Sequence, residues 1–146
     1  VNSVAFSSDD RFLASASRDK TVKVWSTETG LEVSTLHGHI GGVNSVAFSS
    51  DDRFLASASR DKTVKVWSTT TWAELSTLHG HSHWVFSVAF SGDGKFLASG
   101  SDDKTVKLWS TATWDVLSTL HGWVFSVAFS GDAQRLCLFG GVQRGR

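Results

Sequence analysis

Short runs of apolar and β-branched residues alternate with polar turns along most of the chain. The first four runs are NSVAFS (2–7), RFLASAS (11–17), TVKVWS (21–26) and LEVSTL (31–36). Each run is rich in Val, Phe, Thr or Trp and is bounded by turn sequences such as SSDD and RDK, a pattern typical of β-strands. The inner runs carry apolar or small residues on both faces, so we expect both faces of these strands to be covered.

The four-strand pattern repeats along the sequence. Residues 1–27 are identical to residues 43–69, a third copy begins at Val85 and a partial fourth at Val124. The fourth copy follows a loop that lacks the letters HSH, keeps its pattern through VFSVAFSGD, and then turns into AQRLCLFGGVQRGR, which matches nothing upstream. Four-stranded antiparallel sheets at such a period describe propeller blades. We therefore predict an all-β partial β-propeller of about three and a half blades: 1–42, 43–84, 85–123, and a half blade with an irregular tail at 124–146.

Composition narrows the possible partners. The chain has 14 Lys and Arg against 14 Asp and Glu, a formal net charge of zero, so it lacks the electrostatic footprint of a nucleic-acid or membrane-surface binder. No apolar run approaches the roughly 18 residues of a membrane helix, and the single cysteine excludes an internal disulfide. We expect a soluble chain that binds no nucleic acid, membrane or cofactor. Because the chain starts without Met in the middle of a repeat, we interpret it as a processed product or a fragment.

Three signatures recur at fixed offsets. They are GH before the first strand (38–39 and 80–81), LASAS or LASGS in the second strand, and D-x-T-V-K-[VL]-W across the following turn and third strand. From residue 1 to about 132, the chain resembles the WD-repeat β-propeller family. The eponymous Trp-Asp pair is Trp-Ser in every copy here, a position that varies in the family. The resemblance implies a propeller fold and a non-catalytic role in recognition.

The resemblance also implies a set of structural residues. In the family, the turn Asp, the GH histidine, a strand Ser and the Trp form a hydrogen-bonded network that fastens each blade. This network would consist of His39, Ser57, Asp61 and Trp67 in blade 2, of His81, Ser99, Asp103 and Trp109 in blade 3, and of Ser15, Asp19 and Trp25, without a histidine, in blade 1. Blade 4 lacks the histidine, has Leu138 where the Ser is expected, and does not reach the Asp or Trp.

Two chemical alternatives use the same residue types. Ser, His and Asp together also describe a hydrolase triad, but the set recurs in successive blades without a Gly-x-Ser-x-Gly elbow, and we predict no catalytic residue. The alternating histidines of HGHSH (79–83) could hold zinc or copper. Since His81 belongs to the fastening network and no Cys or carboxylate lies nearby at ligand spacing, we predict no metal site.

Partners of the family commonly dock on the face that carries the loops into the first strand and the turns between the second and third strands. We call it the loop face. Its candidate docking residues here are Arg18, Asn44, Arg60, Trp84, Phe86, Asp102, Trp123 and Phe125, with Asn2 and Gly42 at matching positions. Arg and Trp dominate binding hot spots, although the aromatic residues could instead pack between blades. Trp72 and Trp114 lie on the opposite face, as interface anchors or as covers of a hairpin.

We therefore predict a non-catalytic protein-interaction scaffold. A lectin-like binder with repeated aromatic sites at Trp84 and Trp123, and a fragment with no activity of its own, are the alternatives. An arc of three and a half blades leaves both end faces uncovered, and such apolar faces associate. We predict a homodimer in which two arcs close a ring of eight blade positions about a two-fold axis.

Overall fold

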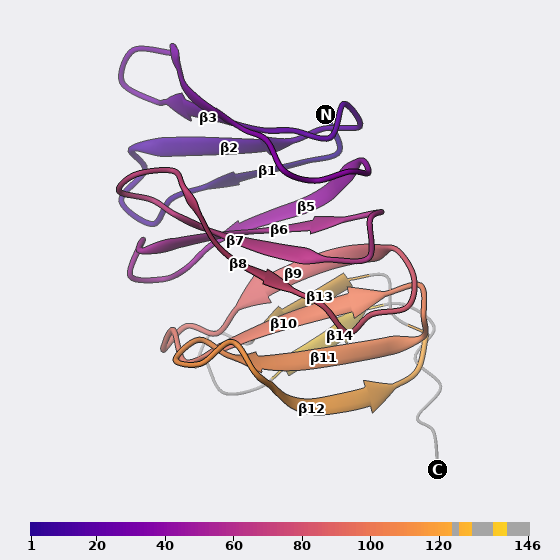
Figure 1. The fold of residues 1–146 in the computed structure, drawn as a ribbon. Helices are drawn as coiled ribbons and strands as arrows, with labels where there is room; N and C mark the ends of the chain where they lie inside the picture. Colours follow the sequence, from indigo (N-terminus) through magenta and orange to yellow (C-terminus); the bar gives the residue numbers. More distant parts are fainter. Residues whose placement is uncertain (124–125, 130–135, 140–146) are drawn as a thin grey trace.

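The computed structural model describes residues 1–123, 126–129 and 136–139. Three sheets of four antiparallel strands follow one another along the chain, and a two-stranded sheet comes last (Figure 1). Blade 1 contains β1 (Ser3–Phe6), β2 (Phe12–Ala16), β3 (Val22–Ser26) and β4 (Glu32–Leu36). Blade 2 contains β5 (Val43–Phe48), β6 (Phe54–Ser59), β7 (Val64–Ser68) and β8 (Glu74–Leu78). Blade 3 contains β9 (Val85–Phe90), β10 (Phe96–Ser101), β11 (Thr105–Ser110) and β12 (Val116–His121), and the last sheet pairs β13 (Ser126–Phe129) with β14 (Leu136–Phe139).

This architecture confirms the predicted fold class. Each blade is an antiparallel meander in chain order, and the predicted runs differ from the strands by a residue or so at their ends. In the described ranges, no helix has the length and apolar character needed to cross a membrane.

The turn between the first two strands of each blade is made by its own side chains. Ser7 Oγ donates to Asp9 Oδ1 (2.7 Å) and accepts the backbone N–H of Phe12 (3.0 Å). Blades 2 and 3 repeat these bonds. The residue after the turn Asp has a positive φ, 59° at Asp52 and 73° at Gly94, a conformation that Asp and Gly tolerate better than other residues. The SSDD and SGDG sequences thus fix the hairpin locally.

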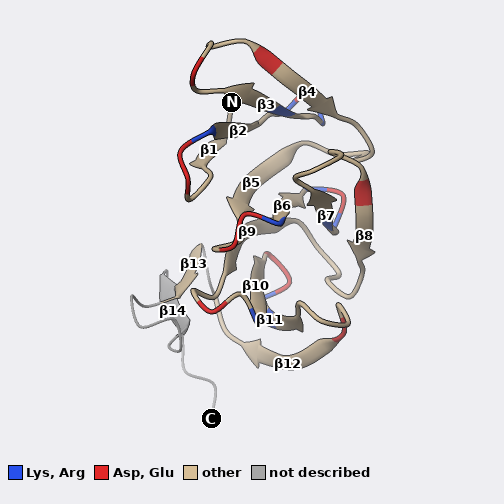
Figure 2. Cartoon of the chain, turned by 90° about the vertical axis from the view of Figure 1, so that its left-hand side faces the viewer, with Lys and Arg blue, Asp and Glu red and all other residues tan. Residues whose placement is uncertain are grey.

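The blades stack face to face along an arc, and the core lies between them. The innermost strands β1, β5, β9 and β13 contact one another in order and line the inner side of the arc (Figure 2). Each blade presents small and β-branched residues to the following blade and larger residues to the preceding one. Between blades 1 and 2, the buried side chains are Ala14, Ala16, Val22, Val24 and Leu36 from blade 1, and Val43, Val46, Leu55 and Trp67 from blade 2.

Blade 1 has an uncovered face, which we call the leading face. It is formed by Val1, Val4, Leu13 and Trp25, whose sequence equivalents in blade 2 pack against blade 1. Val4 is 57% exposed whereas its equivalent Val46 is 5% exposed. Because residues 1–27 and 43–69 are identical, the difference comes from position in the arc alone. The leading face therefore has the composition of a blade interface.

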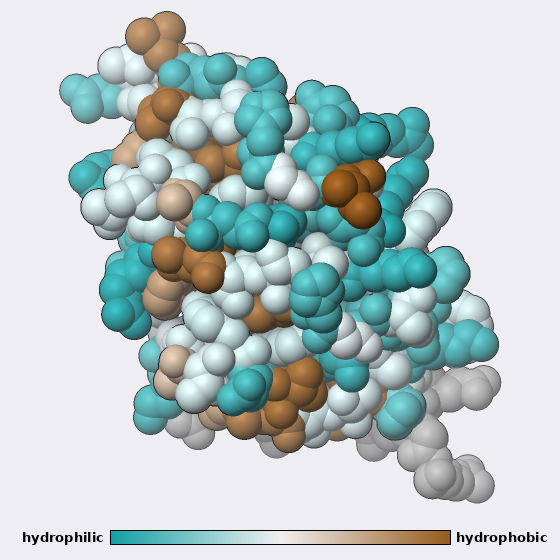
Figure 3. All heavy atoms as spheres, in the orientation of Figure 1, coloured by the Kyte–Doolittle hydropathy of each residue, from teal (hydrophilic) through white to brown (hydrophobic). Residues whose placement is uncertain are grey.

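The outer strand of blade 3 also carries apolar surface. Val116, Leu117 and Leu120 in β12 are exposed, and hydrophobic atoms gather over this strand at the lower edge of Figure 3. Blade 2 has Glu74 at the position of Val116, where it pairs with Lys65 Nζ at 2.6 Å. Lys107 is the equivalent of Lys65, and Val116 offers it no carboxylate. Its Nζ donates a hydrogen bond to Thr119 Oγ1 (3.0 Å).

Candidate functional site

In blades 2 and 3, the structure brings together the four residue types of the fastening network. In blade 2, Trp67 Nε1–H donates to Ser57 Oγ at 2.9 Å, and His39 bridges Ser57 Oγ (2.7 Å, from Nε2) and Asp61 Oδ2 (2.7 Å, from Nδ1). Blade 3 repeats the chain through Trp109, Ser99, His81 and Asp103, with distances of 2.8, 2.7 and 2.8 Å. We call each such set a tetrad. It connects the second and third strands of a blade to the loop that enters it.

The donors of the tetrad run in one direction. An indole N–H can only donate and an ionised carboxylate can only accept. Ser57 Oγ therefore accepts from Trp67 Nε1–H, and the Asp61 carboxylate accepts from Nδ1–H of His39, whose Nε2 lies 2.7 Å from the Ser57 hydroxyl oxygen. Burial alone would raise the pKa of Asp61, but hydrogen bonds from His39 and Thr63 outweigh it and hold this pKa well below its usual range.

The same physics acts in blade 3. Burial lowers the pKa of His81, against the opposing effect of the Asp103 carboxylate, so the imidazole is neutral at physiological pH. Burial by itself raises the pKa of Asp103, and hydrogen bonds from Thr105 and His81 bring it below the usual value. Ser99 is fully buried and its oxygen is already shared by an indole and an imidazole. This arrangement holds a structural serine rather than an exposed nucleophile.

Blade 1 contains three members of a tetrad. Trp25 Nε1–H donates to Ser15 Oγ at 3.1 Å. Asp19 Oδ1 accepts the N–H and the hydroxyl of Thr21 at 3.0 and 2.6 Å, as Asp61 does with Thr63. These bonds from Thr21 lower the pKa of Asp19. The turn and the indole bond thus form without a histidine.

Two cation–aromatic pairs lie on the loop face. The Arg60 guanidinium lies 4.5 Å from the ring centroid of Trp84, and Lys104 Nζ lies 4.7 Å from that of Trp123. In each pair, the cation lies in the turn between the second and third strands of one blade, and the indole lies in the loop that enters the next blade. Trp84 and Trp123 are 39% and 46% exposed. Within the described part of the chain, Arg60 Nε is the one buried side-chain polar atom without a hydrogen-bond partner.

The other predicted docking residues have different surroundings. Arg18 is exposed and Asp102 is half-buried, with its carboxylate 3.3 Å from Nδ1 of His83. Phe86 packs edge-on against Trp84, with ring centroids 6.5 Å apart. Asn44 is used between blades, because its Nδ2 donates to the carbonyl of Val85 at 3.0 Å. Phe125 lies outside the described residues.

Trp72 and Trp114 pack onto the preceding blade. Trp72 meets Phe12 of blade 1 edge-on at 5.3 Å, and Trp114 meets Phe54 of blade 2 at the same distance. Both have a positive φ, 60° and 62°, which costs a bulky residue conformational energy. Their contacts therefore identify them as clamps between blades. Blade 1 has Gly30 at this position, and a Cβ there would meet no atom within 4 Å.

A second contact between blades was not predicted from the sequence. Asp52 Oδ1 accepts the backbone N–H of Ser8 (2.8 Å) and Asp52 Oδ2 accepts the Ser8 hydroxyl (2.6 Å), joining the first turns of blades 1 and 2. Blade 3 has Gly94 in the place of Asp52. The sequence signal for this contact is the second Asp of SSDD in blades 1 and 2, which the SGDG of blade 3 lacks.

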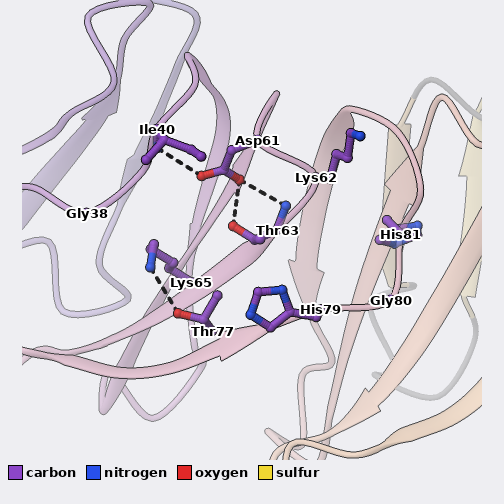
Figure 4. A pocket seen from close by; sticks show the side chains of 10 residues that line it. All are labelled: Gly38, Ile40, Asp61, Lys62, Thr63, Lys65, Thr77, His79, Gly80 and His81. Atoms are coloured by element: carbon purple, nitrogen blue, oxygen red, sulfur yellow. Dashed lines mark hydrogen bonds between the residues drawn. The ribbon is translucent and has the colours of Figure 1, made fainter.

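A pocket of about 360 Å³ lies beside the blade 2 tetrad (Figure 4). Lys62, Lys65 and His79 contribute to its lining. The Lys65 ammonium donates to Thr77 Oγ1 at 2.9 Å and to Glu74 Oε1 at 2.6 Å. Asp61 is bonded to Ile40 and Thr63 at the pocket wall (Figure 4). No group of three or more potential metal ligands occurs among the described residues.

Comparison with known proteins agrees with the arrangement of the strands in blades. The family model described as "WD domain, G-beta repeat" matches residues 1–26, 30–68 and 72–110. The chain belongs to the WD40-repeat family. It is 49% identical over 41 residues to the Notchless protein homolog of Arabidopsis thaliana, a match that covers 28% of this chain and 9% of that protein. The solved "Structure of U3-55K" superposes on it with a TM-score of 0.84 and 30% identity, over 87% of this chain and 42% of that one. This WD40 chain thus spans less than half of each relative.

Proposed function

We propose that this WD40 chain is a non-catalytic protein-interaction scaffold whose docking surface is the loop face around Arg60 and Trp84. The observation that carries the proposal is the state of Arg60. Its guanidinium is stacked on Trp84 at 4.5 Å, so its position is fixed. Its Nε is buried without an acceptor in the described part of the chain, so a partner would bind the terminal nitrogens of this half-buried side chain.

An arginine held in this way fits a carboxylate. Guanidinium groups bind carboxylates through two parallel N–H···O bonds, and a pre-positioned side chain loses less entropy when it binds. The exposed faces of Trp84 and Trp123 add apolar contact area next to the two cations. The surface therefore suits an acidic peptide segment of a partner protein.

The test uses a peptide array in which Asp and Glu positions are varied within peptides of otherwise constant sequence. The chain should bind acidic peptides, and Arg60→Ala should abolish binding while the far-ultraviolet circular dichroism spectrum stays unchanged. Arg18→Ala is the matched control, because it lies in the identical SRDKT turn but has Gly42 where Arg60 has Trp84. Binding that survives Arg60→Ala, or an array without acidic hits, would refute this docking surface.

The scaffold would also associate with itself through the leading face. Val1 is 82% exposed and Val4 57% exposed, whereas the same residues in blade 2 are 0% and 5% exposed. A second copy placed beside blade 1 would bury this surface, and two arcs could close a ring of eight blade positions. Light scattering at micromolar concentration should give the mass of a dimer. Val4→Arg should reduce it to a monomer, whereas Val33→Arg on the outer strand β4 should not; a monomeric unmodified chain would refute self-association.

A further inference from the structure

The pocket beside the blade 2 tetrad does not include Arg60 or Trp84. Its walls come from the loop that enters blade 2, from the turn and strand of β7, from the end of β8 and from the loop that enters blade 3. Its volume of about 360 Å³ lies at the lower end of the range of small-molecule sites. The docking surface on the loop face therefore does not account for this pocket.

The carboxylate that lines the pocket has no free hydrogen-bonding capacity. Asp61 Oδ1 accepts the N–H and the hydroxyl of Thr63 at 2.9 and 2.6 Å. Its Oδ2 accepts Nδ1–H of His39 at 2.7 Å and the backbone N–H of Ile40 at 3.1 Å. The two oxygens of a carboxylate offer about four acceptor positions, and these four donors fill them. Asp61 therefore offers no bonding position to a cationic ligand.

The ammonium group that lines the pocket does have free capacity. Lys65 is buried, and its Nζ donates to Glu74 Oε1 at 2.6 Å and to Thr77 Oγ1 at 2.9 Å. An ammonium group carries three N–H donors, so the third has no partner among the described residues, and a buried donor without an acceptor is unfavourable. The His79 ring lies on the same side of the pocket as Lys65 (Figure 4) and can supply a second donor. The pocket therefore suits a ligand with two acceptor oxygens.

Ile40 gives the pocket an apolar wall. Its side chain is 81% exposed, although its backbone N–H is held by Asp61. Blade 3 has Ser82 at this position, and the Ser82 N–H makes the same bond to Asp103 at 3.1 Å. The loop thus forms without the isoleucine side chain, and covering this side chain with an apolar group would be favourable.

We propose that this pocket binds a small carboxylic acid with a short apolar body. The carboxylate accepts N–H bonds from Lys65 and His79, and the hydrocarbon lies against Ile40. Lys62 adds a positive charge at the rim. Glu74 opposes the ligand, because it occupies one donor of Lys65 and carries a negative charge of its own. A phosphate group has more charge and more acceptor oxygens than these donors can satisfy, so the carboxylate fits better.

The test is a nuclear magnetic resonance titration at constant pH that follows the imidazole C–H signals. The probe is 4-methylpentanoate, and the matched control is 4-methylpentanamide, which has the same shape without the charge. The signal of His79 is assigned through His79→Ala, and His37, in the identical STLHGH sequence of blade 1, is the internal reference. We expect a saturable shift of the His79 signal with the acid only. An equal shift with the amide, an equal shift of His37, or no saturable shift would overturn the site.

Two variants that copy blade 3 decide the assignment. Ile40→Ser should weaken binding of the acid several-fold, whereas Val33→Ser, which removes an exposed apolar side chain from β4, should leave it unchanged. Glu74→Val should tighten binding several-fold, because Lys65 gains a free donor and keeps its bond to Thr77. Blade 3 folds with the serine and the valine at these positions, so both variants should fold. Binding that Ile40→Ser leaves unchanged, or that Glu74→Val weakens, would contradict the proposed site.

Discussion

Replacing Asp61 by alanine tests the tetrad against a control of identical local sequence. Asp61 accepts two bonds on the histidine side, from His39 at 2.7 Å and the N–H of Ile40 at 3.1 Å, and two from Thr63 at 2.9 and 2.6 Å. Asp19, in the same sequence of blade 1, accepts only the bonds of its turn. Both variants lose the turn bonds, so the difference between them reports the two bonds on the histidine side, from His39 and from the Ile40 N–H.

The magnitude follows from burial. The side chains of His39 and Asp61 are only 1% and 4% exposed, so water screens their interaction little. A hydrogen bond to a charged group contributes about 1.5–3 kcal/mol, and a buried donor left without an acceptor costs about 1–3 kcal/mol. We expect Asp61→Ala to lower the free energy of unfolding by about 3 kcal/mol, which corresponds to about 6–12 °C in Tm for a chain of this size. Asp19→Ala should cost clearly less.

The assay is urea and thermal unfolding of both variants and of Asp103→Ala, followed by circular dichroism and tryptophan fluorescence. Equal m-values across the series would allow the free energies to be compared. Asp103→Ala should resemble Asp61→Ala because blade 3 has the same tetrad. An Asp19→Ala loss as large as that of Asp61→Ala would show that the carboxylate acts through its turn, and the role given to the histidine would be wrong.

Three further changes have expected outcomes. Trp72→Gly, which copies blade 1, removes the indole from Phe12 but relieves a positive φ, so urea unfolding should show a loss of about 2 kcal/mol. Gly94→Asp offers Ser50 an acceptor, since the Cβ would lie 3.6 Å from Ser50 Oγ, and should raise Tm by a few degrees; a lower Tm would contradict the contact between first turns. Burial lowers the pKa of His81, so as the pH falls this histidine takes up a proton in the unfolded chain before it does so in the folded chain. Urea titrations should therefore show constant stability above about pH 6.5 and a decline below it.

The fold could be predicted because its determinants are local and repeated. The first hairpin of each blade is specified by a short turn whose Ser and Asp side chains accept backbone N–H groups within five residues, and the strands alternate in the same way in each copy. The tetrad residues could be named because three recurring motifs resemble those of the WD-repeat family, and the resemblance implies the network. A single copy of the pattern would have left the assignment open.

The contacts between blades could not be predicted with the same detail. Asn44 and Trp72 contact residues 41 and 60 positions away in the chain, and sequence periodicity does not show which face of a blade meets which neighbour. Asn44 was expected on a docking surface but bonds Val85. Trp72 was expected to anchor an interface or to cover its own hairpin, and its real partner is Phe12. The absence of a side chain at Gly30, the matching position in blade 1, was the one available signal.

The bonds between neighbouring blades have a consequence for how such a gene can change. Asn2 bonds Val43, Ser8 bonds Asp52 and Asn44 bonds Val85, so each bond joins residues about one repeat apart. The identical copies at residues 1–27 and 43–69 thus each encode both halves of a junction. Unequal recombination that adds or removes whole repeats creates a new junction already complementary, whereas a crossover out of phase destroys two at once. The identity of residues 1–27 and 43–69 is the state from which such in-phase exchange is easiest.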